Sequence, residues 1–187
     1  KLMDSIIYSN GAAKCAFDLA LYDIIGKKKE LPVWRLLGGT NPVVHNDITV
    51  GIDTPEKMRD AAERFVSQKG FDILKIKVGI NLDDDIRALT LIRQAVGKNV
   101  RLRVDANQGW TAEQSVSIIR AMEDRGLDIE LVEQPVPAHD LAGLKEVARA
   151  VDTPILADEA VFSHYDAARI IEERAADLIN IKLMKTG

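Results

Sequence analysis

Two kinds of hydrophobic pattern divide the chain near residue 40. Before that point, apolar residues recur at helical spacing between residues 9 and 26, and a short helical segment covers residues 32–37. From residue 43 onward, short runs rich in Val, Ile and Leu alternate with longer amphipathic segments. These runs predict six strands, at residues 44–52, 71–79, 100–107, 128–135, 153–160 and 177–184.

Capping residues set the expected ends of the helices. Ser9 or Asn10 can begin the first helix and Gly26 can end it, with the basic residues 27–29 in a solvated turn. Thr54 followed by Pro55 begins the helix after the first predicted strand. Between the strands we expect helices at residues 54–70, 83–96, 111–126, 140–151 and 163–175.

Strands that alternate with helices of this size predict βαβ units and a parallel sheet. A polar residue stands near the C-terminal end of each predicted strand, at intervals of 24 to 28 residues: Thr49, Lys77, Asp105, Glu133, Asp158 and Lys182. In a (β/α)8 barrel, the chemistry lies at those strand ends. The competing fold is an open doubly wound sheet, which usually has a glycine-rich phosphate loop after its first strand; VGIDTPE is not such a loop.

Lys75 and Lys77 are two positions apart in the second predicted strand and therefore share a face. Leu74, Ile76 and Val78 occupy the opposite face. Two neighbouring ammonium groups lower each other's pKa, and a lysine with a lowered pKa can act as a general base. The alternative is an edge strand whose lysines are simply solvated.

Arg103 has the same parity as Asp105 in the third predicted strand, so both side chains face the barrel interior. Barrel interiors are normally filled by branched apolar residues. An unpaired buried charge is very costly, and Arg103 is therefore tolerable only if carboxylates neutralise it.

Three carboxylates on successive strands, Asp105, Glu133 and Asp158, are expected to meet on one side of the barrel mouth. Hard oxygen ligands suit Mg²⁺ or Mn²⁺, and the absence of Cys and His from the set argues against zinc. The alternative is that these acids balance the lysines and Arg103 without a metal. Lysines on both sides of the acids suit removal and return of a proton at one carbon, although a single lysine can instead form a Schiff base.

Composition excludes several function classes. The 187 residues carry a net charge of −4 with acids and bases interspersed, so no basic stripe suggests nucleic acid. No apolar run approaches the roughly 18 residues that a membrane span needs. Cys15 is the single cysteine, which excludes an internal disulfide and favours a reducing, cytoplasmic setting.

Five motifs in this order and spacing, KIKVG, RVDANQGW, VEQPV, LADEA and INIKLMKTG, resemble the enolase superfamily, muconate lactonizing enzyme subgroup. The stretch CAFDLALYDIIGKKKELPVWRLLGG resembles the helices of that family's capping domain. The resemblance implies that residues 1–40 are the C-terminal helices of a capping domain. It also implies that residues 41–187 form strands one to six of an incomplete (β/α)8 barrel of the TIM type.

The resemblance also implies residue roles. Asp105, Glu133 and Asp158 match the Mg²⁺ ligands. Lys77 and Lys182 match the acid/base groups on opposite faces of the substrate, and Lys75 matches the lysine that neutralises the substrate carboxylate and depresses the pKa of Lys77. Four further positions match residues that support the metal ligands or contact substrate: Asn107, Gln134 and Glu159 for support, and Thr49 for substrate.

The implied reaction is a Mg²⁺-dependent epimerisation that removes and returns the proton α to a carboxylate through an enediolate. INIKLMKTG looks most like the dipeptide epimerases of the L-Ala-D/L-Glu type, which implies a dipeptide substrate and a homo-oligomeric full-length enzyme. Cycloisomerases, o-succinylbenzoate synthases and N-acylamino acid racemases use the same scaffold and remain alternatives.

Six predicted strands fall short of the eight that such a barrel needs. We therefore expect this chain to be a piece of a larger enzyme and to be inactive by itself. A structural or metal-binding remnant without catalysis is the non-enzyme alternative.

Overall fold

The computed structural model describes residues 2–186 and divides them into two compact units. Within the described range, the first unit comprises residues 2–45, 162–164 and 181–186. The second comprises residues 46–161 and 165–180. The regular elements of the first unit are helices, whereas the second unit alternates strands with helices.

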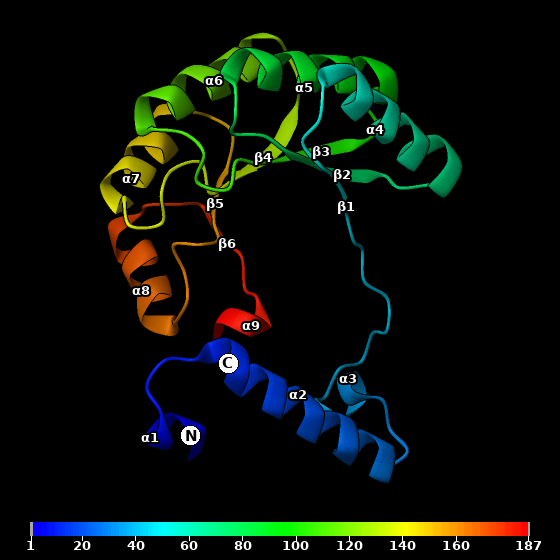
Figure 1. Ribbon diagram of the computed structural model, residues 1–187, viewed down its shortest axis with the longest axis vertical. Coiled ribbons are helices and arrows are strands. Elements are labelled where there is room, and N and C mark those ends of the chain that lie inside the picture. Colours follow the sequence, from blue (N-terminus) through cyan, green and yellow to red (C-terminus); the bar gives the residue numbers. More distant parts are fainter. Residues whose placement is uncertain (1, 187) are drawn as a thin grey trace. The chain divides into compact units, whose positions relative to one another are not determined.

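The second unit is built on a six-stranded parallel sheet whose strands lie side by side in the order of the sequence (Figure 1). The strands are shorter than predicted: β1 Ile48–Val50, β2 Ile73–Lys77, β3 Arg101–Asp105, β4 Ile129–Glu133, β5 Ile155–Ala157 and β6 Leu178–Ile179. Within the described residues, β1 and β6 each pair with a single neighbour.

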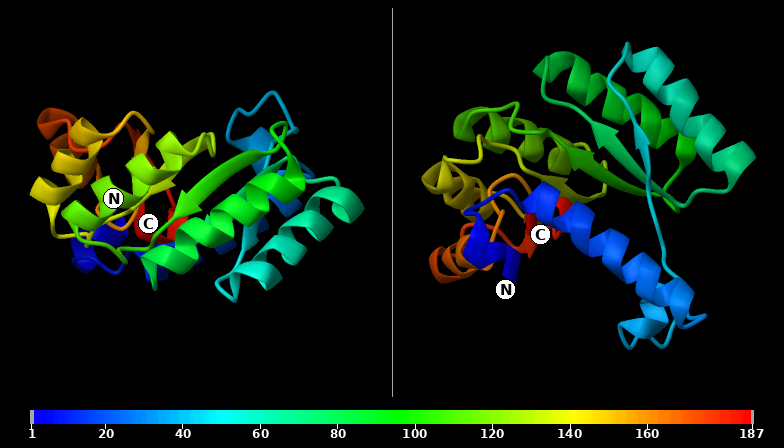
Figure 2. Two further views of the ribbon diagram at one scale, coloured as in Figure 1. Left: turned by 90° about the horizontal axis from the view of Figure 1, so that it is seen from above. Right: turned by 60° about the horizontal axis from the view of Figure 1, so that its bottom comes forward.

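The helices of this unit connect successive strands and cover one face of the sheet (Figures 1 and 2). They are α4 Pro55–Lys69, α5 Leu82–Val96, α6 Ala112–Asp124, α7 Leu141–Ala150 and α8 His164–Glu173. A doubly wound sheet reverses its strand order and has helices on both faces. Sequential strands with all helices on one face are instead six units of a (β/α)8 barrel, which confirms the predicted fold class.

The core of the second unit lies between the sheet and these helices. Leu74 and Ile76 of β2 are fully buried toward the helices, as their predicted parity requires. Leu102 of β3 and the helical residues Leu89 and Ile119 belong to the same core and are equally buried. Burying a side chain of this size stabilises the fold by about 1.5–3 kcal/mol. The opposite face of the sheet is thereby left to the polar side chains.

Side-chain caps fix where several helices begin. The Asn81 carboxamide oxygen accepts hydrogen bonds from the backbone N–H groups of Asp83 and Asp84, so α5 begins slightly before the predicted residue 83. Thr111 and Gln114 form a reciprocal capping box at the start of α6. These caps determine the directions in which the chain leaves the strand ends.

Arg93 joins the end of α5 to the two loops that precede β3 and β4. These loops lie at the N-terminal ends of the strands, opposite the C-terminal ends that carry the predicted site residues. The buried Arg93 guanidinium donates to four backbone carbonyl oxygens at 2.7–2.9 Å, those of Gly97, Val100, Leu127 and Asp128. Those carbonyls lie just before β3 and β4. Arg93 therefore holds the starts of two strands whose ends carry predicted site residues.

The first unit is helical and contains α1 Leu2–Ile6, α2 Gly11–Lys28, α3 Val33–Leu36 and α9 Leu183–Thr186. The expectation that Gly26 ends the first long helix is wrong, because α2 continues to Lys28. Gly26 is instead a close-packing position: an added Cβ would lie 2.9 Å from the Leu31 carbonyl oxygen, where the chain returns against the helix. Its own carbonyl accepts a hydrogen bond from the Leu31 N–H at 3.0 Å.

The last predicted strand is also too long. Only Leu178 and Ile179 pair with β5, and residues 183–186 form α9 instead. The N–H groups of Lys185 and Thr186 both donate to the Lys182 carbonyl oxygen, at 2.9 and 3.2 Å. Lys182 therefore precedes a helical turn and does not lie on a strand.

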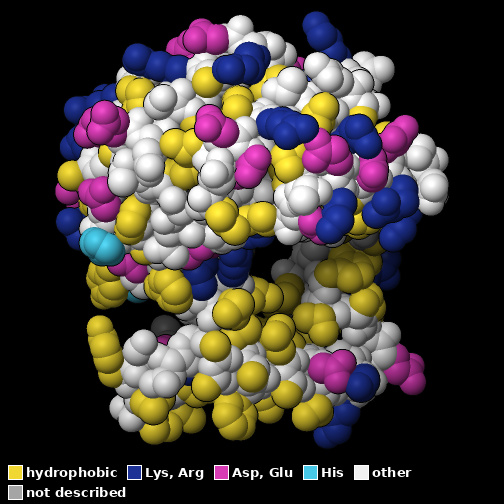
Figure 3. Space-filling view, turned by 45° about the horizontal axis from the view of Figure 1, so that its top comes forward, with side chains coloured by type: hydrophobic (Ala, Val, Ile, Leu, Met, Phe, Trp, Pro, Cys, Tyr) yellow, Lys and Arg dark blue, Asp and Glu magenta, His cyan; other side chains and the backbone are white. Residues whose placement is uncertain are grey.

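The surfaces of the two units differ in composition (Figure 3). Hydrophobic side chains gather over the first unit, where Phe17, Leu21 and Ile24 of α2 are more than half exposed. Charged side chains of both signs are interspersed over the helices of the second unit. Among residues 2–186, no helix combines the length and apolarity needed to cross a lipid bilayer.

Candidate active site

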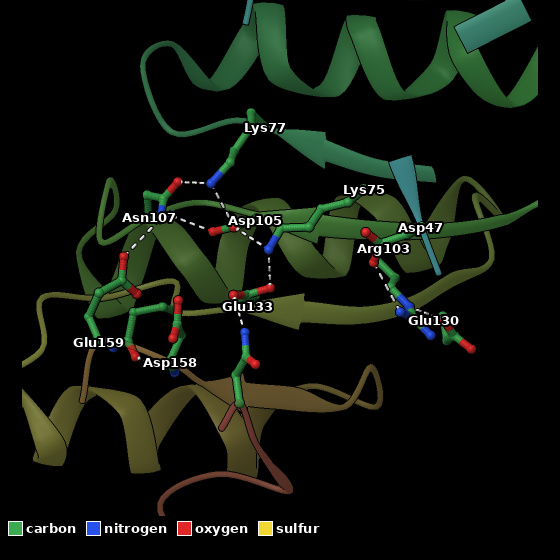
Figure 4. A network of polar contacts seen from close by, with 12 residues as sticks. Asp47, Lys75, Lys77, Arg103, Asp105, Asn107, Glu130, Glu133, Asp158 and Glu159 are labelled. Carbon is green, nitrogen blue, oxygen red and sulfur yellow. Dashed lines mark hydrogen bonds and ion pairs between the residues drawn. The ribbon is translucent and has the colours of Figure 1, made fainter. Parts of the chain in front are cut away.

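Lys77, Asp105 and Glu133 are the last residues of β2, β3 and β4 and pair with one another in register. Their side chains lie on the face of the sheet that the helices leave open (Figure 4). Together with Lys75 they form what we call the strand-end cluster. The structure thus brings four predicted site residues together at one edge of the sheet.

Lys75 links the two carboxylates of this cluster. Its Nζ lies 2.8 Å from Asp105 Oδ2 and 2.7 Å from Glu133 Oε2. Burial of the ammonium group lowers the pKa of Lys75, but the hydrogen bonds and charges of Asp105 and Glu133 outweigh burial and raise that pKa overall. The expectation of a lowered pKa is therefore wrong for Lys75 here, because two carboxylates act on it more strongly than its neighbouring lysine.

Lys77 contacts a carboxylate and an amide. Its Nζ lies 2.8 Å from Asp105 Oδ2 and donates to Asn107 Oδ1. The Asn107 amide in turn donates to Glu159 Oε1 at 2.8 Å, and the Asn107 backbone N–H donates to Asp105 Oδ1 at 3.0 Å. Asn107 has a φ of 43°, a left-handed conformation that Asn tolerates better than most residues. Asn107 thereby connects Lys77 with the segment after β5.

Gln134 fixes the position of the segment that carries Asp158. The fully buried Gln134 carboxamide oxygen accepts hydrogen bonds from the backbone N–H groups of Asp158 at 2.9 Å and Ala160 at 3.1 Å. Its NH₂ group donates to the Val136 carbonyl oxygen at 2.9 Å. The Asp158 side chain is buried on the same side of the sheet as Asp105 (Figure 4).

Glu133 has a partner outside the set of site residues predicted from the sequence. Asn180 follows β6, and its amide donates to Glu133 Oε1 at 2.9 Å. Burial raises the pKa of Glu133, and the charge of Asp105 adds to that effect against the opposing effect of Lys75. The signal for Asn180 was its parity, since it stands two residues before Lys182 in the motif INIKLM.

The donor set has the chemistry of a hard-cation site. Asp105 Oδ2 and Glu133 Oε2 are almost fully buried and already converge on one cationic atom, the Nζ of Lys75. Carboxylate oxygens are the ligands that Mg²⁺ and Mn²⁺ prefer. Between residues 2 and 186, however, no three Asp, Glu, His or Cys side chains are arranged to hold a metal ion as they stand. In this arrangement the lysine ammonium groups bind the carboxylates.

Two further predicted site residues are Thr49 and Lys182. Thr49 is exposed in β1, where it pairs in register with Lys75. Lys182 belongs to the first unit, directly before α9. The assigned roles of both residues stay predictions.

A second group of charges lies on the same face of the sheet, nearer the starts of the strands. Arg103 Nη1 lies 3.1 Å from Asp47 Oδ2, and Arg103 Nε donates to Glu130 Oε2. We call Asp47, Arg103 and Glu130 the Arg103 cluster (Figure 4). The prediction that carboxylates neutralise Arg103 is confirmed, and the structure identifies them as Asp47 and Glu130.

Residues 57–187 match the protein family described as "Enolase C-terminal domain-like", and residues 1–38 match "Mandelate racemase / muconate lactonizing enzyme, N-terminal domain". The chain therefore belongs to the enolase superfamily, in the group of mandelate racemase and muconate lactonizing enzyme. The two matched ranges leave residues 39–56 between them, so the expected domain boundary between residues 40 and 41 stays a prediction.

The chain is similar to several dipeptide epimerases. It is 50% identical to the L-Ala-D/L-Glu epimerase of Bacillus subtilis (strain 168) over 183 residues, which are 97% of this chain and 50% of that protein. It is 48% identical to the hydrophobic dipeptide epimerase of Enterococcus faecalis, covering all of this chain and 52% of that protein. The chain thus spans about half the length of the curated relatives it matches.

Solved structures agree with these relatives. The dipeptide epimerase from Enterococcus faecalis V583, complexed with Mg and the dipeptide L-Leu-L-Tyr, superimposes with a TM-score of 0.93 at 49% identity, covering 99% of this chain and 51% of that one. The Cytophaga hutchinsonii dipeptide epimerase, complexed with Mg and D-Ala-L-Val, gives a TM-score of 0.91 at 38% identity, over 99% of this chain and 50% of that one. The six βα units therefore have the architecture of about half of such enzymes.

Proposed function

We propose that the full-length protein is a Mg²⁺-dependent dipeptide epimerase that removes and returns the proton α to a carboxylate. The observation that carries this proposal is the strand-end cluster, in which two buried carboxylates converge on one cation beside Lys77. Its support from relatives is the 48–50% identity with dipeptide epimerases that spans almost the whole chain. The substrate class we propose is a small-molecule carboxylate, specifically a dipeptide.

The three carboxylates Asp105, Glu133 and Asp158 would hold Mg²⁺, and Mn²⁺ has the same ligand preference. Bound there, the metal supplies Lewis-acid stabilisation to the substrate carboxylate as negative charge develops during proton removal. The hydrogen bonds of Asn180 to Glu133 and of Gln134 to the Asp158 backbone would fix the orientation of two of these ligands.

Lys77 would remove the α proton from one face of the substrate in one direction of the reaction, and in the reverse direction it would deliver a proton to that face. It must lose its own proton before it can remove that of the substrate, and Asn107 would hold its amine in position through the contact at Oδ1. Lys182 would exchange the proton on the opposite face, a role that rests on its place in the matched family range. Lys75 would present positive charge toward the substrate carboxylate, and Glu159 would hold Asn107.

Thr49 would contact substrate from β1.

We further propose that the full-length protein is a homo-oligomer in a reducing, cytoplasmic compartment. The apolar residues exposed on α2 support the first statement, and the buried, unpaired Cys15 supports the second. Light scattering during size-exclusion chromatography tests the oligomeric state directly.

The test of the activity is exchange of the α proton for deuterium in D₂O with the full-length protein. We expect exchange and epimerisation with L-Ala-L-Glu or another dipeptide in Mg²⁺, and neither after metal removal by EDTA. The comparison substrates are muconate and the precursor of o-succinylbenzoate. Turnover of either of those, without exchange in any dipeptide, would replace the epimerase assignment by a different reaction on the same residues.

A further inference from the structure

The Arg103 cluster depends on an irregularity in β4. In the pairing of β3 with β4, Leu102 pairs with Ile129 but Arg103 pairs with Leu131, which leaves Glu130 as an extra residue. This is a β-bulge, and bulges are rare between parallel strands. They occur often beside active sites, where they redirect a side chain.

The bulge changes the face on which Glu130 lies. We call the face of the sheet that the helices leave open the inner face. Counting back from Glu133 by strict alternation would place Leu131 and Ile129 on the inner face and would point Glu130 toward the helices. Ile129 instead packs against the core beneath the helices, and Glu130 reaches Arg103 on the inner face. The extra residue thus delivers a carboxylate to Arg103 that a regular strand would withhold.

Arg103 needs such partners because of where it lies. It pairs in register with Lys75 and stands two residues before Asp105, about 6.6 Å along the strand. Asp105 and Glu133 are therefore within the reach of a long arginine side chain. Arginine stays charged at any physiological pH and binds carboxylates with two parallel hydrogen bonds, more firmly than lysine does. A free Arg103 would thus compete for both strand-end carboxylates.

Asp47 and Glu130 draw Arg103 the other way. Asp47 precedes β1 and Glu130 is the second residue of β4, so both partners lie toward the strand starts. Figure 4 shows Arg103 turned toward these two residues and away from Asp105 and Glu133. Both Arg103 partners keep their side chains at least two-thirds buried, which strengthens these ion pairs relative to surface ones.

We propose that Asp47 and Glu130 are positioning residues: they hold the Arg103 guanidinium away from the two strand-end carboxylates and so leave those carboxylates to a metal ion. This inference rests on the proposed metal site. It assigns a purpose to the bulge, which supplies one of the two anions that this arrangement needs.

The test measures Mg²⁺ affinity by isothermal titration calorimetry in the full-length protein. The double variant Asp47→Asn with Glu130→Gln leaves Arg103 charged and without its anions, and it also removes the Glu130 carboxylate from Arg101. We expect its Mg²⁺ affinity to fall roughly tenfold or more, the loss typical when a residue supporting a metal site is removed. Adding Arg103→Met to make the triple variant should restore the affinity to near the wild-type value. Glu146→Gln, on the exposed face of α7, is the control for loss of one negative charge.

The outcomes separate this inference from the proposed function. Wild-type protein that binds no Mg²⁺ overturns the metal site and this inference together. Wild-type binding with an unchanged double variant overturns the positioning role alone, and so does a loss that Arg103→Met fails to rescue. If the double variant does not fold, as judged by circular dichroism, Glu130→Gln alone must show a smaller loss that Arg103→Met reverses; no loss in that variant would also overturn the role.

Discussion

The strand-end cluster and the Arg103 cluster share one face of the sheet, and each pairs an Asp and a Glu with basic side chains. They differ in the type of cation that binds the carboxylates: lysine in the first and arginine in the second. In the Arg103 cluster one guanidinium is held between Asp47 and Glu130. In the strand-end cluster the ammonium group of Lys75 bridges two carboxylates that are nearly inaccessible to solvent. An ammonium group is a compact charge on a flexible stem, whereas a guanidinium binds as a fixed fork. We infer that carboxylates bound by a lysine can exchange that cation for a metal ion, whereas carboxylates bound by the arginine stay bound to it.

Removing a strand-end carboxylate should have the largest effect on function. We expect Glu133→Gln to lower Mg²⁺ affinity by at least about 100-fold, beyond the roughly 10- to 100-fold cost of losing a supporting residue. The reason is that the amide is neutral and one of its two terminal atoms is a donor. Calorimetry against the Glu146→Gln control measures the change, and a Glu133→Gln protein that binds Mg²⁺ normally would show that this carboxylate is no ligand.

Removing the cation of the Arg103 cluster should affect stability instead. Arg103→Met leaves the partly buried Asp47 without the guanidinium that pairs with it, and leaves Glu130 with Arg101 as its remaining partner. We expect the free energy of unfolding to fall by about 2 kcal/mol. Urea unfolding followed by circular dichroism measures this. Neutralising both acids in the same protein should recover part of the loss. An unchanged midpoint for Arg103→Met would mean that the cluster contributes nothing to folding.

Gln134 separates support of a ligand from ligation itself. Replacing it by the similarly sized Met removes the acceptor of the Asp158 and Ala160 N–H groups. We expect Mg²⁺ affinity to fall by about tenfold, less than for Glu133→Gln, because the Asp158 carboxylate stays present but less well placed. Equal losses in the two variants, with folded protein in both, would contradict this ranking.

The smallest effect concerns pH. Burial raises the pKa of Glu130, but the hydrogen bonds and charges of Arg103 and, to a smaller extent, of Arg101 together outweigh burial, so the pKa of Glu130 lies below its ordinary value. A carboxyl group whose pKa is lower in the folded state stabilises the fold above its unfolded pKa, and that stability is lost as pH falls through the lowered pKa. We expect less than about 1 kcal/mol from this group, since it is partly exposed. Thermal unfolding from neutral to acidic pH should show a shallower decline for Glu130→Gln than for wild type.

Much of the fold could be predicted from local patterns. Alternation of strand and helix periods located all six strands, and strand parity placed Lys75, Lys77, Asp105 and Glu133 on one face because side chains in a strand repeat every two residues. Local patterns failed where the structure depends on distant residues. Helix α2 continues through Gly26. The glycine is needed there because the segment at Leu31 packs so closely against the helix that a side chain would not fit, and not because the helix ends.

The same limit applies to the site. The bulge at Glu130 lies in the pairing of β4 with β3 and places Glu130 against Arg103 of β3. A pattern within one strand could not predict it, because it depends on the register between two strands. The predicted direction of the Lys75 pKa shift was wrong. The sequence showed the neighbouring lysine but not the two carboxylates that the Lys75 Nζ bridges. Asn180 was visible only by parity, and its contact with Glu133 depends on strand order.

Stereospecific deuterium exchange decides whether two lysines exchange the α proton on opposite faces of a dipeptide. The measurement follows exchange from the L,L and the L,D dipeptide separately in the full-length protein, its Lys77→Ala variant and its Lys182→Ala variant. We expect wild type to exchange both epimers, each variant to lose exchange from one epimer, and the two variants to lose opposite ones. Loss of both epimers' exchange in Lys77→Ala with full exchange in Lys182→Ala would contradict the two-base mechanism, since a single base would then serve both faces.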